Sequence, residues 1–197
     1  MIKYANAFCP NDIATLHKQT ISEGFLSKLG LGFLKSLYKF LIKKEIVLVY
    51  QEEENVLGFV SCTLSSKNIM RRFLLYNPFI IIKIFLSIIM NPALIKPLFE
   101  TYRAPSLSDS SKKNSIKLPD TELLSISVSP EAQKEGIGTK LLNALETELK
   151  NKGITQYKVI AGEKLMGANK FYRKNSFKLI KQVAIHGNDI SNVYVNY

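Results

Sequence analysis

The order of predicted secondary structure along the chain indicates an α+β domain. β-rich runs alternate with amphipathic helical stretches, and two pairs of these runs are joined by turns short enough for antiparallel hairpins. The chain has 197 residues, of which 46% are hydrophobic, and this suits one globular domain with an ample core. We therefore expect residues 1–197 to form a single α+β domain.

The N-terminal part of the chain predicts a strand, two helices and a hairpin. Residues 2–9 alternate weakly and suit a strand, after which Asn11 or Asp12 caps a helix. A second amphipathic helix follows the glycine-containing break at residues 29–32. The β-rich residues on either side of an acidic turn then predict a hairpin over residues 46–64.

A strand that leads through a glycine-containing turn into a helix is the most informative local feature. The strand over residues 123–128 breaks at Pro130, and Gly136 and Gly138 precede a helix that extends to about residue 152. Such a turn leaves several backbone N–H groups without intrahelical partners and directs them, with the positive end of the helix dipole, at one point. A phosphate is the anion that we expect there.

The two glycines of this turn are predicted to have separate roles. Gly136 allows the backbone to approach a ligand with no Cβ in the way, and Gly138 allows the first helical turn to lie near the preceding strand. The turn is not a P-loop, because no Gly-Lys-Ser/Thr follows it, and it lacks the three-glycine spacing of a dinucleotide site. Gly153 stands where the helix would end on a left-handed residue.

This turn and a second segment resemble the GNAT superfamily of N-acyltransferases. Gln-x-x-Gly-x-Gly at residues 133–138 is similar to the family's acetyl-CoA pyrophosphate turn, and residues 168–177 are similar to its Ala-x-x-Phe-Tyr-x-x-x-Gly-Phe segment. The specific similarity covers residues from about 120 to the C-terminus. It implies a central mixed, mostly antiparallel twisted sheet flanked by helices, with a helical insertion at about 66–118 between the third and fourth strands.

The resemblance also implies acetyl-CoA as cosubstrate and assigns residues to it. The strand before the turn should be splayed from its neighbour, so that Ile126 and Val128 present backbone groups to the pantetheine arm. Asn169 either faces that arm or is a solvated polar position. The full set of predicted cofactor-binding residues is Ile126, Ser127, Val128, Gln133, Lys134, Glu135, Gly136, Ile137, Gly138, Thr139 and Asn169.

Two side chains are predicted to carry the chemistry. Glu122 matches a position where some family members hold a general base, and burial can raise the pKa of a Glu enough for it to accept an amine proton; the alternative is an exposed charge at a strand end. Tyr172 matches the residue that protonates the leaving thiolate, and the alternative is a core tyrosine. The chain departs from the family pattern at Leu165, where many members have Asn, and at Ser176, where Gly is usual.

The predicted insertion contains a largely apolar stretch. Its uninterrupted part, residues 79–90, is shorter than the roughly 20 residues that a membrane-spanning helix needs, and it contains Lys83. Residues 71–90 therefore predict either a lid whose basic residues face an anionic acceptor or a peripheral membrane contact. We favour the lid.

Composition restricts the partners of the chain. The net charge of +11 favours an anionic partner, but the basic residues are spread along the chain. No aromatic-basic motif is present, so we do not expect nucleic acid as a partner.

Cys9 and Cys62 suit reduced core thiols, and His17 and His186 are too few and too far apart for a metal site. The N-terminal residues lack a signal-peptide pattern, which predicts the cytoplasm, and the oligomeric state stays open.

The acceptor is predicted to be a small-molecule primary amine. The insertion and the hairpin at residues 183–195 resemble a GNAT subgroup associated with bacterial surface-polysaccharide clusters, which implies an amino sugar or a nucleotide-linked amino sugar. Residues 186–189 are more typical of a turn than of an acceptor contact. The open alternatives are polyamines, protein N-termini, or an acyl-CoA-binding regulatory module without turnover.

Overall fold

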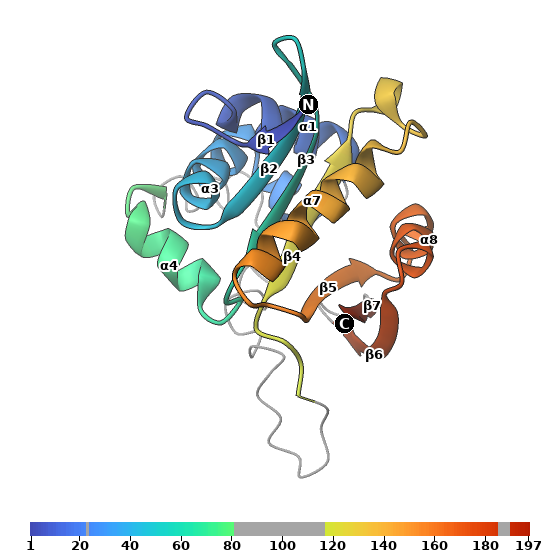
Figure 1. Cartoon of the computed structure of the whole chain (residues 1–197). Helices are drawn as coiled ribbons and strands as arrows, with labels where there is room; N and C mark the ends of the chain where they lie inside the picture. Colours follow the sequence, from blue (N-terminus) through green and yellow to red (C-terminus); the bar gives the residue numbers. More distant parts are fainter. Residues whose placement is uncertain (23, 81–116, 185–189) are drawn as a thin grey trace.

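The computed structural model describes residues 1–22, 24–80, 117–184 and 190–197, which form a seven-stranded sheet with helices on both faces (Figure 1). The strands lie in the order β1-β2-β3-β4-β5-β7-β6. Their bounds are β1 Ile2–Tyr4, β2 Ile46–Glu52, β3 Asn55–Thr63, β4 Glu122–Val128, β5 Tyr157–Gly162, β6 Lys178–Ala184 and β7 Ile190–Asn196. Every neighbouring pair is antiparallel except β4 and β5, which are parallel. The predicted α+β class and the mixed, mostly antiparallel sheet are confirmed.

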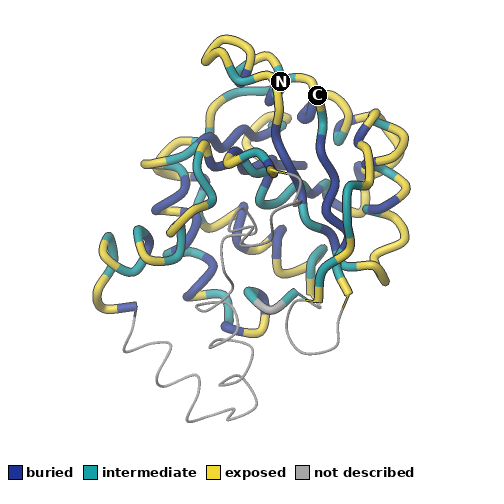
Figure 2. The backbone as a smooth tube through the Cα atoms, turned by 90° about the horizontal axis from the view of Figure 1, so that it is seen from below, coloured by how far each residue is buried: buried dark blue, intermediate teal, exposed yellow. Residues whose placement is uncertain are grey.

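The helices form two layers, one on each face of the sheet. They are α1 Pro10–Thr20, α2 Phe25–Lys28, α3 Leu31–Lys44, α4 Ile69–Tyr76, α7 Ile137–Asn151 and α8 Met166–Lys174. Alternate residues of β2 pack into different layers: Val47 and Val49 lie in the cluster with α1, α3 and α4, whereas Ile46 and Leu48 lie in the cluster with α7 and α8. Figure 2 shows the buried residues concentrated along the strands between these layers.

The first helix begins earlier than predicted. β1 ends at Tyr4, and α1 starts at Pro10 with Cys9 as its N-cap, so neither Asn11 nor Asp12 caps it. Proline suits this first helical position because the missing N–H would have no intrahelical partner there. The predicted hairpin is confirmed as the antiparallel pair β2 and β3.

Only the two ends of the predicted insertion belong to the described residues. α4 forms the first end, and residues 81–116, with the second half of the 71–90 segment, lie outside the described residues. Arg72 is bound internally, since its Nη1 is 2.7 Å from Glu45 Oε1 and its Nη2 donates to Ser65 O at 2.6 Å. The expectation that the basic residues of this stretch face an acceptor is therefore wrong for Arg72. Within the described ranges, no helix has the length and apolar character needed to cross a membrane.

The C-terminal strands complete the sheet and contain its exposed edge. β6 and β7 pair as the predicted antiparallel hairpin, and the predicted turn at residues 186–189 lies outside the described residues. β6 is the last strand of the sheet, and all of its residues are exposed or half-buried. Both cysteines are free and buried, as predicted for core thiols.

Candidate active site

The parallel strands β4 and β5 pair at one end only. Glu122 lies opposite Lys158 and Leu123 opposite Val159, and the pairing stops there although both strands continue. On its other side β4 stays paired with β3 along its length, with an extra residue, Leu124, between two successive pairs. Such a bulge bends its strand, and this one lies where β4 leaves β5. The predicted splay of β4 from its neighbour is present, and β5 turns away from β4 in Figure 1.

Backbone groups of β4 face the open side of this splay. Ser129 N–H donates to Leu57 O of the β3 side at 2.8 Å, so alternation along the strand directs the peptide groups of Val128 and Ile126 away from β3. The Val128 carbonyl accepts a bond from the side chain of Gln133 at 3.3 Å rather than from a strand. The predicted residue Ser127 has a different role, because its hydroxyl donates to Thr20 Oγ1 on α1 at 2.5 Å.

The turn after β4 is exposed and its helix is uncapped. Gln133, Lys134, Glu135 and Gly136 are all exposed, and Thr139 is exposed at the start of α7, whereas the predicted residue Ile137 is a buried core residue. Lys134 and Gly136 are left-handed, with φ of 69° and 78°. No side chain caps α7, and its first N–H with a recorded backbone acceptor is that of Lys140. The N–H groups at the start of α7 are therefore available to an anion, as an anion-binding helix terminus requires.

Gly138 is closely packed against two neighbouring elements. A Cβ on this residue would lie 3.3 Å from Phe171 Cε2 on α8 and 3.8 Å from Val128 Cγ2 on β4. The predicted close approach of the first helical turn to the preceding strand is confirmed, and contact with α8 is closer still. A Cβ on Gly136 would meet nothing within 4 Å, so this glycine is required by its positive φ.

Tyr172 lies on the buried face of α8. Its side chain is 5% exposed, and its ring contacts Phe171, Phe177 and Tyr194 at centroid distances of 5.6, 5.3 and 5.9 Å. Burial raises the pKa of its hydroxyl, which keeps the proton in place. No hydrogen bond from this hydroxyl to any of the described residues is recorded, and an unsatisfied buried polar group costs about 1–3 kcal/mol. A buried, protonated hydroxyl with no partner in the described residues could donate a hydrogen bond or a proton to a bound ligand.

Asn169 has neither of its two predicted environments. It is 5% exposed, so the alternative of a solvated position is wrong. Its Nδ2 donates to the carbonyl of Gly162 at 2.9 Å and to that of Leu165 at 2.8 Å. Its Oδ1 accepts bonds from Asn192 at 2.7 Å and Tyr194 at 2.9 Å. Because the amide is saturated by the protein, Asn169 fixes α8 to β7 and has no donor left for the pantetheine arm.

Glu122 lies at the closed end of the splay, in contact with a buried lysine. Its Oε2 is 3.5 Å from Lys158 Nζ, and the two side chains are 16% and 2% exposed. Burial raises the pKa of Glu122, and the Lys158 charge opposes that rise. The alternative of an exposed strand-end charge is wrong.

Lys158 also joins the two ends of the insertion, a role that was not predicted. Its Nζ donates to Ser66 Oγ at 2.9 Å and to the carbonyl oxygens of Pro119 and Asp120. Ser66 N–H donates in turn to Asp120 O at 2.9 Å. The available signal was a single lysine inside an apolar strand, which burial permits only if the charge has partners.

A second unpredicted polar group lies on the opposite face of β4. His17 Nδ1 is 2.6 Å from the hydroxyl of Tyr38, both side chains are buried, and Tyr38 also interacts with Ser125 of β4. Burial lowers the pKa of His17 to about 4, so the imidazole is neutral at pH 7. Together with the bond from Ser127 to Thr20, this group ties the middle of β4 to α1 and α3.

Comparison with known proteins found a family model that matches the part of the chain holding this site. The family model described as an acetyltransferase (GNAT) domain matches residues 110–179, which include β4, the turn, α7, β5 and α8. Residues 110–179 are therefore similar to a GNAT acetyltransferase domain. No curated protein matches the sequence.

Solved acetyltransferases share the fold over their whole length. An N-acetyltransferase from Staphylococcus aureus Mu50 is 20% identical with a TM-score of 0.63, and 99% of each chain is covered. PaiA N-acetyltransferase from Thermoplasma acidophilum, in complex with coenzyme A, is 14% identical with a TM-score of 0.60, covering 100% of this chain and 98% of the other. A GNAT family acetyltransferase from Elizabethkingia anophelis, with acetyl-CoA bound, is 13% identical with a TM-score of 0.53, covering 100% and 96%.

Two features of the matched region bear on a cosubstrate. The matching family model is described as an acetyltransferase (GNAT) domain. The uncapped start of α7 fits a pyrophosphate, and the open side of β4 fits an extended amide-containing arm. Among the described residues no group of three or more His, Cys, Asp or Glu side chains is placed to hold a metal ion.

Proposed function

We propose that the chain is an N-acetyltransferase that moves the acetyl group of acetyl-CoA to a primary amine. The observation that carries this proposal is the one-ended pairing of β4 and β5, which opens beside an exposed and uncapped helix start. Acetyl-CoA supplies the thioester. Backbone groups of Ile126 and Val128 bind the pantetheine arm, and the backbone of residues 134–139 binds the pyrophosphate.

For each chemical step of this transfer, the chain has a group that can carry it out. Glu122 accepts the amine proton, directly or through water, and its burial favours that role by raising its pKa. A backbone N–H of β4 donates to the carbonyl oxygen as negative charge develops on it. Tyr172 gives its proton to the sulfur as the carbon–sulfur bond breaks, which leaves a free thiol.

The acceptor that we propose is an amino sugar, either free or linked to a nucleotide. The similarity of the sequence to a subgroup associated with bacterial polysaccharide clusters supports it, and the net charge of +11 suits a phosphorylated acceptor. A screen that follows release of the CoA thiol tests this, using amino sugars, nucleotide-linked amino sugars, polyamines and peptide N-termini. Turnover confined to polyamines or peptides would replace the amino sugar with that class.

A binding module without turnover is the second candidate. The contact between Glu122 and Lys158 favours it, because a carboxylate held by a lysine is a weaker base. Calorimetry with acetyl-CoA, run beside the thiol screen, separates the two candidates. Saturable binding with no thiol release from any amine would support the module.

A further inference from the structure

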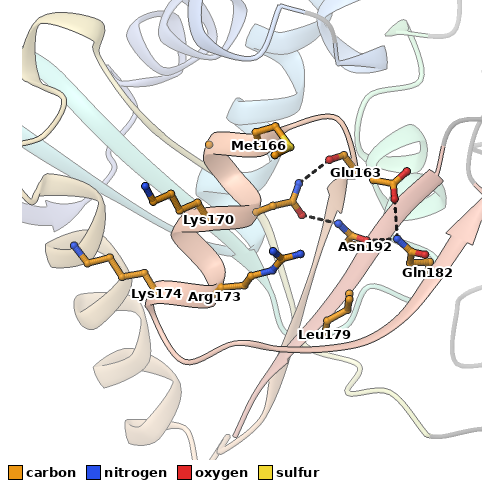
Figure 3. Close-up of a pocket in the computed structure, with 10 residues that line it drawn as sticks. Glu163, Met166, Lys170, Arg173, Lys174, Leu179, Gln182 and Asn192 are labelled. Carbon is orange, nitrogen blue, oxygen red and sulfur yellow. Dashed lines mark hydrogen bonds between the residues drawn. The ribbon is translucent and has the colours of Figure 1, made fainter.

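A cavity separate from the splay lies between α8 and the C-terminal hairpin (Figure 3). Its volume is about 780 Å³, within the range of roughly 300–1,000 Å³ that small-molecule sites occupy. It lies on the side of α8 that faces away from α7, since Phe171, which contacts the position of Gly138, does not line it. Its lining residues from α8 include Met166, Asn169, Lys170, Arg173 and Lys174, and those from the strands include Leu179, Gln182 and Asn192.

The charge of this cavity is positive and unbalanced. Lys170, Arg173 and Lys174 line it with a single carboxylate, Glu163, so three positive charges and one negative charge give a net charge of +2. Glu163 is engaged by Gln182, whose Nε2 lies 3.0 Å from its Oε1. No ion pair is recorded between any of the three cations and an acid among the described residues.

Arg173 is the cation that points across the cavity. In Figure 3 its guanidinium extends from α8 toward Asn192 and Leu179, whereas Lys170 and Lys174 extend from the other side of the helix. A guanidinium presents paired N–H donors that match the oxygens of a phosphate or a carboxylate. The two lysines add a favourable potential at the rim.

The other walls are apolar or rigid. Met166 and Leu179 are large apolar side chains that are 77% and 45% exposed, so an apolar part of a ligand would cover them. The amides at the strand side bind one another: Gln182 Nε2 donates to Asn192 Oδ1 at 2.9 Å, and Asn192 Nδ2 donates to Asn169 Oδ1 at 2.7 Å. These bonds hold the wall in place without a ligand, which reduces the entropy lost on binding.

We propose that this cavity binds a small molecule that carries a phosphate or a carboxylate on an apolar body. Arg173 binds the anionic group, and Met166 and Leu179 cover the apolar part. The site is distinct from the pyrophosphate turn, and the proposal does not depend on acetyl transfer.

The test is a titration of the full chain followed by backbone amide chemical shifts. The probes are phenyl phosphate, benzoate, inorganic phosphate and benzyl alcohol, each with and without excess CoA. Phenyl phosphate or benzoate should shift the amides of α8, β6 and β7 saturably, whether or not CoA is present. Whichever of the two binds more tightly identifies the anionic group. Inorganic phosphate and benzyl alcohol should each bind more weakly than the molecule that combines their features.

Matched substitutions then locate the anion. Arg173→Gln, at an exposed residue, should fold normally and weaken binding of the tighter probe by about tenfold or more, as expected for loss of a charge-assisted hydrogen bond. Lys170→Ala and Lys174→Ala should each weaken it by roughly two- to fivefold, as rim charges do. Lys39→Ala, an exposed lysine on α3, is the control and should leave binding unchanged.

Four results would overturn the proposal. Shifts confined to residues 134–140 would place the anion at the turn. Equal affinity of the Arg173→Gln variant and the natural sequence for the tighter probe would leave an apolar groove with no anion site. Equal affinity of the natural sequence for benzyl alcohol and phenyl phosphate would lead to the same conclusion. Tight binding of a single-stranded oligonucleotide with a steep salt dependence, and no binding of the small probes, would assign the cations to a macromolecule. Failure of CoA to bind would count against the proposed acetyl transfer and would leave this test intact.

Discussion

The two ends of β4 are built in opposite ways. At the N-terminal end, Glu122 and Lys158 form a buried contact that also holds Ser66 and the chain at residues 119–120. At the C-terminal end, Val128 leads into an exposed turn whose backbone N–H groups have no cap. Side-chain contacts therefore fix the N-terminal end of β4, whereas backbone N–H groups at its C-terminal end are free to bind a ligand. Substitutions at the closed end should affect stability, and those at the open end should affect binding.

Lys158→Met should have the largest effect. The change leaves the half-buried Glu122 without its cation and two carbonyl groups without their donor, and removal of one partner of a buried pair costs about 3–5 kcal/mol. We expect the free energy of unfolding to fall by about 3 kcal/mol or more in urea denaturation. Lys150→Met, at an exposed position of α7, is the control. A loss below about 1 kcal/mol would mean that the closed end does not depend on this contact.

The middle of β4 provides a pH-dependent test of the face that packs against α1 and α3. His17 has a folded pKa of about 4, below its ordinary value of 6.5, so the unfolded chain binds a proton more readily. Stability is then full above pH 6.5 and falls as the pH drops toward 4, by about 3 kcal/mol in total. Denaturation at pH 7, 5.5 and 4.5 measures this fall. His17→Phe should flatten the pH dependence, and an unchanged slope would mean that other groups cause it.

The two ends also differ in how far the sequence could predict them. The turn was predictable because its glycine positions leave a local pattern at residues 133–138, and the splay was implied by the resemblance of the sequence to a known family. The roles of Lys158 and Asn169 were not predictable in this way. Their partners, Ser66 and Asn192 among them, are distant in sequence and meet only in the folded sheet. The start of α1 was missed because Pro10 was interpreted as a strand end rather than as a first helical residue.

In the proposed reaction Tyr172 donates the proton to the sulfur, so Tyr172→Phe should separate activity from stability. The ring packing against Phe177 and Tyr194 is retained, whereas the proton donor is lost, so kcat should fall about 100-fold. Removal of a buried hydroxyl with no recorded partner should raise the free energy of unfolding by about 1 kcal/mol. Steady-state kinetics and urea denaturation of the same preparation measure both. Full activity in the variant would show that the thiolate takes its proton from solvent or another group.

The smallest expected effects come from the two glycines of the turn, which form a matched pair. Gly136→Ala places a Cβ on a residue with φ of 78°, which should cost about 1 kcal/mol of stability and disturb the backbone that meets the pyrophosphate. Gly138 has a helical backbone, so Gly138→Ala gains about 1 kcal/mol of helix propensity. The new Cβ would lie only 3.3 Å from Phe171, and the propensity gain offsets the cost of the small displacement of α8 that this contact requires. We therefore expect calorimetry to show weaker CoA binding for Gly136→Ala than for Gly138→Ala. The reverse order would mean that the ligand depends on the packing of α7 against α8 more than on the conformation of the turn.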